Sequence, residues 1–239
     1  PQGTRMNTPR NILITGSSRG LGKAMAEHYL QNGDIVHGCA RTGGAIEHDN
    51  YFHYKVDVAS PDDVTRLFFS LRKEIRQLDA LINNAGVASM NAFALTPVES
   101  FKKIFEINVQ GTFLFCQKAL GLLKRSPSPR IINMTTVAVP LQLEGESTYA
   151  ASKSAVETLT RIIAKEYGSF GITCNAIGPS PIETDLIKGV GRDKIARLLD
   201  RQAIRQMASP DDVINVANFF LRPESRMISG QVIYLGGVS

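Results

Sequence analysis

The sequence contains little cysteine. Its 239 residues include three, and Cys39, Cys116 and Cys174 lie far apart with no spacing typical of metal ligands. Each lies in an apolar stretch, which predicts buried free thiols, no metal site and a reducing compartment. We therefore expect a cytoplasmic protein.

Long apolar runs and a strong excess of charge are also missing. No run reaches the roughly 18 residues of a membrane span, and no secretory signal is visible. The net charge of +5 is small and dispersed, which argues against a nucleic-acid-binding surface. Because 43% of the residues are hydrophobic and 21% are charged, we expect a folded globular protein with neither a membrane nor a nucleic acid as partner.

One local excess of positive charge stands out near residues 188–205. It could be the solvated face of an amphipathic helix, or a basic lid that meets an anionic substrate. The sequence leaves both interpretations open. The basic members are Lys188, Arg192, Lys194, Arg197, Arg201 and Arg205, against the acidic Asp193 and Asp200.

Apolar runs of strand length alternate with helical periodicity along the chain. We expect strands at residues 11–15, 34–40, 52–58, 80–83, 130–135, 172–177 and 231–235. We expect helices at residues 20–31, 60–77, 97–107, 109–125, 147–167, 194–207 and 211–221. This alternation predicts a doubly wound α/β fold, with a seven-stranded parallel sheet covered by helices on both faces. Without a linker or repeat, residues 6–239 should form a single domain, and residues 1–5 look like an artificial leader.

A glycine-rich turn follows the first expected strand and opens the first helix. It reads TGSSRGLG, from Thr15 to Gly22. Gly16 allows a tight turn, Gly20 lets the backbone approach a pyrophosphate, and Gly22 lets the helix pack close to the sheet. The free N–H groups at the helix start suit an anion, so the turn predicts a dinucleotide-binding site.

A tyrosine and a lysine stand four residues apart in STYAASKSA, from Ser147 to Ala155. On a helix, Tyr149 and Lys153 would share one face. An ammonium group close to a phenol should lower the phenol pKa and make Tyr149 a proton donor or acceptor near neutral pH. The alternative is a Tyr and a Lys on a solvated helix. These two residues alone do not distinguish a catalytic pair from a solvated one, so the other motifs of the chain are needed.

Taken together, the motifs resemble the short-chain dehydrogenase/reductase family, nearest in pattern to its 3-oxoacyl-(acyl-carrier-protein) reductases. The resemblance covers residues 11–237 and implies a Rossmann fold with hydride transfer between a nicotinamide and a carbonyl or secondary alcohol. Four motifs carry it: Thr15-Gly16-x-x-x-Gly20-x-Gly22, Asn83-Asn84-Ala85-Gly86, Asn108 in EINVQG, and Tyr149-x-x-x-Lys153.

The resemblance also indicates which nicotinamide is bound. Ala40 stands where NAD-dependent members carry an aspartate, so no carboxylate would repel a 2′-phosphate. Arg41 and Arg19 together resemble the arginines of members that prefer NADP(H), although both could simply be solvated. The residues assigned to the cofactor are Gly16, Ser18, Arg19, Gly20, Leu21, Gly22, Arg41, Asp57, Val58, Asn84, Ala85, Gly86, Tyr149, Lys153, Pro179, Ile182 and Thr184.

Four residues match the family's catalytic group. The resemblance implies that Tyr149 protonates the substrate oxygen, that Lys153 tunes the phenol and holds the ribose, and that Asn108 holds a water linked to Lys153. The family's serine is replaced here by Thr136, which keeps the hydroxyl but adds a methyl group and a stiffer rotamer. Thr135 should face the opposite side of the strand.

Two departures weaken the assignment to acyl-carrier-protein reductases. TTVAVPLQLEG replaces a run of small residues, and Phe170 stands where those reductases carry a basic residue. We therefore expect a carbonyl or alcohol substrate that the sequence does not identify, with a 3-oxoacyl thioester as one option. A helical lid at residues 185–207 would cover it. Leu141, Leu143 and Leu186 could form an apolar pocket wall or belong to the core.

The resemblance further implies a homotetramer or homodimer, because family members commonly pair through two long helices, here residues 109–125 and 147–167. Phe113, Phe115, Ala151, Val156 and Leu159 would supply apolar surface for that contact.

A rival function is a non-catalytic cofactor sensor on the same fold. Thr136 is the departure that favours it. The intact Tyr149, Lys153 and Asn108 argue for turnover.

Overall fold

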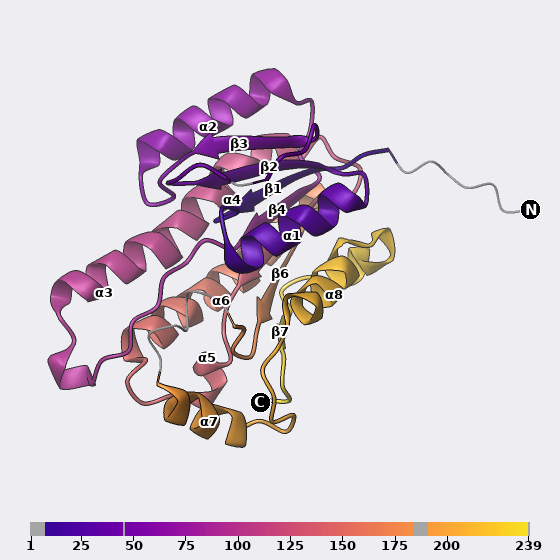
Figure 1. Ribbon diagram of the computed structural model, residues 1–239. Helices are drawn as coiled ribbons and strands as arrows, with labels where there is room; N and C mark the ends of the chain where they lie inside the picture. The colour runs from indigo at the N-terminus through magenta and orange to yellow at the C-terminus, as the bar shows by residue number, and fades with distance from the viewer. Residues whose placement is uncertain (1–7, 45, 184–190, 239) are drawn as a thin grey trace, which may run out of the picture.

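A seven-stranded sheet forms the centre of the molecule (Figure 1), and the computed structural model describes residues 8–44, 46–183 and 191–238. The strand order is β3-β2-β1-β4-β5-β6-β7, and all neighbouring strands are parallel. This order confirms the predicted doubly wound α/β fold. The strands are β1 (Asn11–Thr15), β2 (Ile35–Ala40), β3 (Tyr51–Lys55), β4 (Ala80–Asn83), β5 (Arg130–Met134), β6 (Thr173–Gly178) and β7 (Val232–Tyr234).

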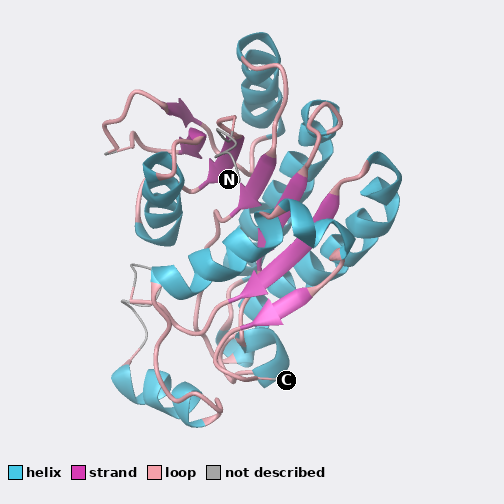
Figure 2. Cartoon of the chain, turned by 90° about the vertical axis from the view of Figure 1, so that its right-hand side faces the viewer, coloured by secondary structure: helices cyan, strands magenta, loops and turns pink. Residues whose placement is uncertain are grey.

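Helices cover both faces of this sheet (Figure 2). Because side chains alternate along a strand, Ile12 and Ile14 of β1 pack with α1 and α8, whereas Leu13 packs with α2, α4 and α6. Two apolar cores result, one on each side of the sheet. The helices are α1 (Gly20–Gln31), α2 (Pro61–Glu74), α3 (Val98–Phe105), α4 (Gly111–Leu123), α5 (Ala138–Leu141), α6 (Ser147–Tyr167), α7 (Arg192–Asp200) and α8 (Pro210–Leu221).

The helical segment between β4 and β5 differs from the prediction. Two helices separated at Asn108 were expected, but α3 and α4 are joined by a π-helical turn, Glu106–Gln110. The turn places the Asn108 side chain against the loop after β4, where its Nδ2 atom donates to the carbonyl of Val87 at 2.9 Å. A π turn inside a helix often marks a functional site, because it redirects one side chain.

The segment after α7 corrects a second boundary. The helix expected at residues 194–207 is α7, which ends at Asp200. The backbone N–H groups of Ala203 and Ile204 instead donate to the carbonyls of Gly237 and Gly236, at 3.3 and 3.0 Å. The segment therefore pairs with the chain beyond β7 rather than continuing the helix.

Smaller differences concern β3 and α5. The strand predicted at residues 52–58 is β3, and it ends at Lys55. Asp57, beyond its end, accepts a hydrogen bond from the N–H of Ala59 at 3.0 Å and so turns the chain toward α2. The short helix α5, which follows β5, was not predicted.

The described part of the chain confirms the predicted thiols and shows no membrane helix. Cys39, Cys116 and Cys174 are buried and free. Within residues 8–44, 46–183 and 191–238, no helix is both long and apolar enough to cross a membrane.

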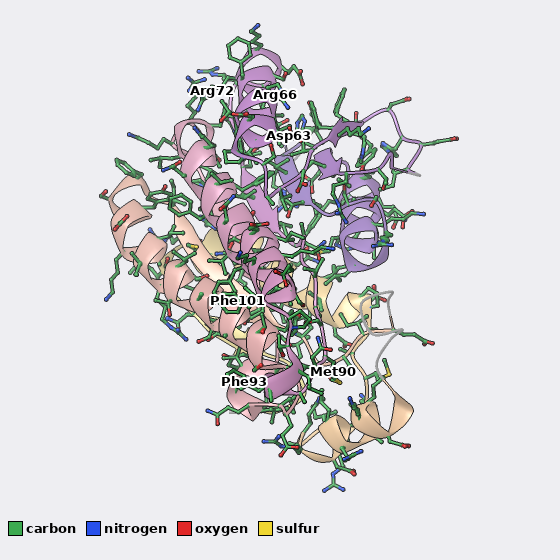
Figure 3. All side chains as sticks on the ribbon, turned by 90° about the vertical axis from the view of Figure 1, so that its left-hand side faces the viewer. Asp63, Arg66, Arg72, Met90, Phe93 and Phe101 are labelled. Carbon is green, nitrogen blue, oxygen red and sulfur yellow. The ribbon has the colours of Figure 1, made fainter. Side chains whose placement is uncertain are left out.

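Exposed aromatic side chains gather on the segment between β4 and α4. Phe93 is 82% exposed and Phe101 is 46% exposed (Figure 3), and Phe113 on α4 is also 46% exposed. Phe115 and Val156 are fully buried in the core. The prediction that these two residues supply surface for subunit pairing is therefore wrong.

Candidate active site

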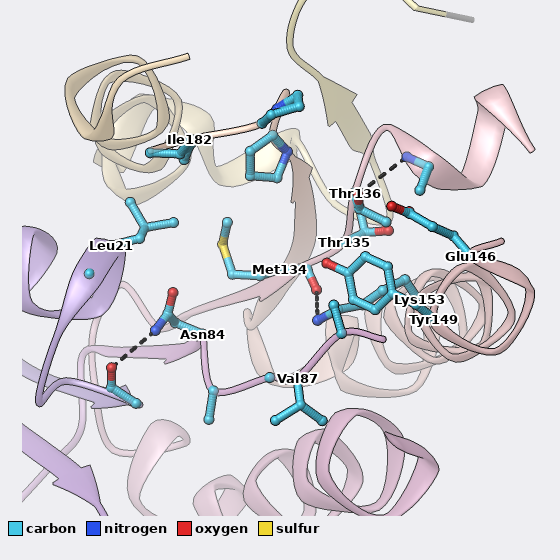
Figure 4. Close-up of a pocket in the computed structure, with 18 of the residues that line it drawn as sticks. Leu21, Asn84, Val87, Met134, Thr135, Thr136, Glu146, Tyr149, Lys153 and Ile182 are labelled. Carbon is cyan, nitrogen blue, oxygen red and sulfur yellow. Dashed lines mark hydrogen bonds between the residues drawn. The ribbon is translucent and has the colours of Figure 1, made fainter. Parts of the chain in front are cut away.

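A cavity of about 1140 Å³ lies at the carboxyl ends of the strands, where doubly wound folds bind their ligands. Its walls come from the loops after β1 to β6, together with α6 and α7 (Figure 4). It brings together residues that the sequence spreads over more than half of the chain. The predicted site residues that line it are Gly16, Ser18, Arg19, Gly20, Leu21, Gly22, Arg41, Asp57, Val58, Asn84, Ala85, Gly86, Thr136, Tyr149, Lys153, Pro179 and Ile182.

Two predicted residues are not among the cavity walls. Thr184 lies outside the described residues. Asn108 is fully buried behind Gly86 and Val87. A Cβ atom on Gly86 would lie 3.2 Å from Asn108 Oδ1 and 3.3 Å from Lys153 Nζ, so this glycine separates the two side chains.

The glycine turn after β1 is held in place by the turn after β4. Thr15 Oγ1 accepts hydrogen bonds from the N–H groups of Asn84 and Ala85 at 3.0 and 2.9 Å. Asn84 Nδ2 donates to the carbonyls of Thr15 and Gly16 at 3.0 and 3.3 Å. The dashed line in Figure 4 marks a bond of the Asn84 amide. The two loops therefore form one rigid edge of the cavity.

This turn has the features that a pyrophosphate requires. Gly16 and Gly20 have φ angles of +71° and +55°, which a residue with a side chain rarely adopts. A Cβ atom on Gly22 would lie 2.3 Å from the carbonyl oxygen of Gly16, so only glycine allows this close packing. Helix α1 begins with no side-chain cap and no acidic residue in its first turn. The residues present therefore fit a dinucleotide whose phosphates meet the start of α1.

Two arginines stand at the same end of the cavity. Arg19 precedes α1 and Arg41 follows β2, and both are exposed cavity-lining residues. Ala40, at the end of β2, also lines the cavity and carries no charge.

The hydroxyl groups of Tyr149 and Thr136 meet in the cavity. Tyr149 is 8% exposed, and burial raises its pKa to about 12. The carboxyl group of Glu146 raises that pKa further, whereas a hydrogen bond with the Thr136 side chain lowers it. Thr136 Oγ1 also accepts from the N–H of Ala138 at 3.2 Å, which fixes its rotamer at the end of β5.

Lys153 does not act on Tyr149 as the sequence predicted. Its Nζ atom donates to the carbonyl oxygen of Met134 at 2.8 Å (Figure 4), and burial lowers its pKa to about 8. The pKa of Tyr149 is raised, and Lys153 is not among the groups that shift it. The expectation that the ammonium group lowers the phenol pKa is therefore wrong for this structure, because the ammonium group faces a backbone carbonyl.

Asn108 uses its whole amide group within the fold. Its Oδ1 atom accepts from the N–H of Val87 at 2.9 Å, and its Nδ2 atom donates to Ser152 Oγ at 3.0 Å as well as to Val87. These bonds tie the loop after β4 to α6, one residue before Lys153. The amide group is thus engaged with protein atoms on both sides.

Thr135 faces away from the cavity centre, as predicted for the neighbour of Thr136. Its hydroxyl donates to Glu157 Oε1 at 2.7 Å, and the hydroxyl of Tyr234 donates to the same atom at 2.6 Å. This buried junction joins β5, α6 and β7 beneath the catalytic residues. The sequence analysis missed it, because its members lie far apart along the chain.

The other end of the cavity carries charged residues that the sequence analysis did not assign to the site. Glu144 and Glu146 line it just before α6. Glu146 could have been found from its spacing, since residues 146, 149 and 153 fall on one helix face. Leu143 lines the cavity, Leu141 is buried without lining it, and Leu186 lies outside the described residues.

Comparisons with known proteins agree with this geometry. A family model described as enoyl-(acyl carrier protein) reductase matches residues 16–238. The chain is 28% identical to the 3-oxoacyl-[acyl-carrier-protein] reductase FabG of Vibrio cholerae, over 94% of this chain and 95% of that protein. It is 26% identical to FabG of Staphylococcus epidermidis, over 95% of this chain and 98% of that protein.

A solved structure gives the same result. Aldohexose dehydrogenase of Thermoplasma acidophilum, in ligand-free form, matches with a TM-score of 0.86 at 27% identity, covering 96% of this chain and 93% of that one. The family model covers most of the chain, and the cavity brings together the glycine turn, Tyr149 and Lys153. The chain therefore belongs to the short-chain dehydrogenase/reductase family, whose members are nicotinamide-dependent oxidoreductases acting on CH–OH or C=O groups.

Proposed function

We propose that this protein is an NADP(H)-dependent oxidoreductase that interconverts a carbonyl compound and a secondary alcohol. The observation that carries the proposal is the proximity of the Tyr149 and Thr136 side chains, which both line the cavity. Two hydroxyl groups that meet there can both point at one substrate oxygen. Arg19 and Arg41, at the opposite end, support the choice of NADP(H).

In the direction of reduction, the carbonyl carbon would receive a hydride, which is the chemistry that a nicotinamide held by the glycine turn and Lys153 would supply. Tyr149 donates its proton to the carbonyl oxygen as negative charge develops there. The Thr136 hydroxyl donates a second hydrogen bond to the same oxygen and stabilises that charge. The raised pKa of Tyr149 keeps the proton on the phenol at neutral pH, which is the state that a proton donor needs, and it makes the phenol a weaker acid than free tyrosine.

The remaining residues position the cofactor and the catalytic hydroxyls. Lys153 lines the cavity beside Tyr149 and would hold the ribose hydroxyls through its amine. Asn108 fixes the loop that carries Gly86 and Val87. We assign Asn108 a positioning role, because its amide group is occupied by protein atoms.

At the adenosine end, Asp57 and Val58 line the cavity and would contact the adenine. Arg19 and Arg41 would pair the 2′-phosphate of NADP(H) through charge-assisted hydrogen bonds. A carboxylate at position 40 would repel that phosphate, and Ala40 removes the repulsion.

The names of the relatives support two different substrate classes. The curated relatives from Vibrio cholerae and Staphylococcus epidermidis are named as 3-oxoacyl-[acyl-carrier-protein] reductases, which supports a 3-oxoacyl thioester. The structural relative from Thermoplasma acidophilum is an aldohexose dehydrogenase, which supports a hydroxylated substrate. In either case α7, part of the proposed lid, would cover the substrate in a single-domain protein.

Two measurements test the proposal. Calorimetric titration should give a tighter Kd for NADPH than for NADH. NADPH oxidation should then be followed with ketones, quinones, aldoses and 3-oxoacyl thioesters, and at least one class should be turned over. Tight NADPH binding without turnover of any class would favour the rival cofactor sensor, and equal affinity for NADPH and NADH would contradict the assigned cofactor preference.

A further inference from the structure

The end of the cavity away from the glycine turn carries charges that the proposed catalytic roles do not use. Glu144 and Glu146 form one side of it, before α6, and basic residues of α7 and its C-terminal end form another. Figure 1 shows α7 well apart from α1. These bases are therefore separate from the phosphate-binding turn. They are Lys194, Arg197 and Arg201.

The three bases lie on the face of α7 that is turned toward the cavity. Their spacing of three and four residues places them above one another on the helix. Ile195 and Leu198 line the cavity from the same helix. The basic segment could be a solvated helix face or a surface that meets an anion. Because the face is turned toward the cavity, the second interpretation is favoured.

Within the described residues, none of the three bases forms a close ion pair, and Lys194 interacts only at longer range with the carboxyl group of Glu146. Arg197 Nε donates to the backbone carbonyl of Asp193 at 3.4 Å. Like charges on one helix face repel one another, and a bound anion removes that repulsion. The cavity therefore has a place for a negatively charged group beside α7.

Near Tyr149, Glu146 provides a carboxyl group that can accept a hydrogen bond from a ligand. It lies three residues before Tyr149, and Figure 4 shows its carboxyl group beside Thr136 and the Tyr149 ring. Within the described part of the chain, no side chain or backbone N–H donates to its carboxyl group. Burial raises its pKa, and Lys194 lowers it. A half-buried carboxylate without a donor favours a ligand that supplies one.

We propose that the substrate is a small hydroxylated anion. A hydroxyl group next to the reacting carbon donates to Glu146, and a carboxylate or phosphate at the distal end binds Lys194, Arg197 and Arg201. This inference rests on the proposed function, because Tyr149 fixes where the reacting carbon lies. A 3-oxoacyl chain offers Glu146 no hydrogen-bond donor, and packing methylene groups against a carboxylate is unfavourable. Sugar phosphates and sugar acids carry both groups that the cavity can bind.

Matched sugars provide the first test. Hexoses of gluco, manno and galacto configuration are compared with their 6-phosphates and their uronates by calorimetric titration, with and without saturating NADP⁺. We expect an anionic form to bind about tenfold more tightly than its neutral parent, and the advantage to shrink as salt concentration rises. The stronger of the two anionic series identifies phosphate or carboxylate as the recognised group.

Variants show which residues cause the tighter binding of anionic sugars. The double variant Arg197→Gln/Arg201→Gln should lose about tenfold in affinity for the anionic sugar and little for the neutral one, since charge-assisted hydrogen bonds are removed. Arg205→Gln is the matched control, because Arg205 is exposed and does not line the cavity. Glu146→Leu should weaken neutral and anionic sugars alike. Glu146→Gln should restore much of the affinity, because the amide oxygen still accepts.

Several results would overturn the inference. Equal affinity for neutral and anionic sugars would do so, as would an equal loss in the Arg205→Gln control. A matching loss of NADPH affinity in the α7 double variant would assign these bases to the cofactor instead. Binding of NADPH and reduction of acetoacetyl-CoA, without binding of any sugar at millimolar concentration, would refute the hydroxylated anion and leave the proposed function intact. Failure of NADPH binding itself would refute the proposed function.

Discussion

The Nζ atom of Lys153 donates a 2.8 Å hydrogen bond to the backbone carbonyl of Met134, and this bond ties α6 to the end of β5. The lysine is buried, and its pKa falls from 10.5 to about 8 because burial disfavours the charged form. Its protonation therefore changes in a pH range where the unfolded chain still holds the proton.

This difference predicts a pH-dependent stability. Between the folded and unfolded pKa values the unfolded chain binds more protons, so the free energy of unfolding rises with pH. Relative to Lys153→Met, the cofactor-free parent should gain about 2 kcal/mol from about pH 7 to about pH 9.5. Urea unfolding of both proteins measures it, and groups common to both cancel. A difference between the two proteins that does not change with pH would contradict the prediction.

Removing the phenol hydroxyl should separate chemistry from binding. Tyr149→Phe is expected to abolish turnover and leave the Kd of NADPH nearly unchanged, because the lost group acts on the transition state. Stopped-flow turnover and a cofactor titration measure the two effects. Tyr167→Phe is the control on the same helix, since the Tyr167 hydroxyl bonds the carbonyl of Cys116 at 3.4 Å, outside the cavity. Normal turnover by Tyr149→Phe would remove this residue from the mechanism.

Two substitutions test the threonine in the serine position. Thr136→Ser keeps the hydroxyl and should retain activity. Thr136→Ala should lower kcat on the order of 10²-fold, the scale of one lost oxyanion donor. Both variants are measured on the same substrate. If Thr136→Ala turned over as fast as the parent, the substrate oxygen would have to lie elsewhere.

The cofactor preference depends on the arginine after β2. Arg41→Ala should weaken NADPH binding by ~1.5–3 kcal/mol, the range for hydrogen bonds to charged groups, and leave NADH binding little changed. Arg72→Ala on α2 serves as control, because this exposed arginine does not line the cavity. A similar loss for both cofactors in the Arg41 variant would show that the 2′-phosphate is not its partner.

We also expect the protein to form a homodimer or homotetramer. The exposed Phe113 lies on α4, one of the two helices through which the resemblance predicts pairing. Phe113→Asp should reduce the mass measured by light scattering, because a charge would be buried in the contact. Phe93→Asp, off those helices, should leave the mass unchanged. A parent protein of monomer mass at micromolar concentration would refute the expectation.

The sequence predicted the sheet and most of the site because both depend on local patterns. The strand-turn-helix around Gly16, Gly20 and Gly22 requires glycine for reasons visible in the sequence, and the structure shows the expected positive φ angles. The length of α6 was also predicted correctly, at Ser147–Tyr167. Tyr149 and Lys153 therefore fell on the expected helix.

Long-range contacts explain what the sequence could not predict. The π turn at Asn108 exists because Val87 and Ser152 satisfy the amide, and neither is near it in the sequence. Helix α7 ends early because residues 203 and 204 pair with the chain after β7. The partner of Lys153 is a backbone carbonyl, which no motif of side chains reveals.

The buried junction of Thr135, Glu157 and Tyr234 is completed late in protein synthesis, because Tyr234 lies on the last strand, β7. The hydroxyl groups of Tyr234 and Thr135 both donate to Glu157, so this carboxyl group lacks one of its donors until the ribosome has made β7. Folding of the earlier strands can begin first, but the wall that carries Thr136 gains its last anchor only when residue 234 arrives. A chain stopped short of β7 would carry every proposed catalytic residue and still present them on an unfinished support.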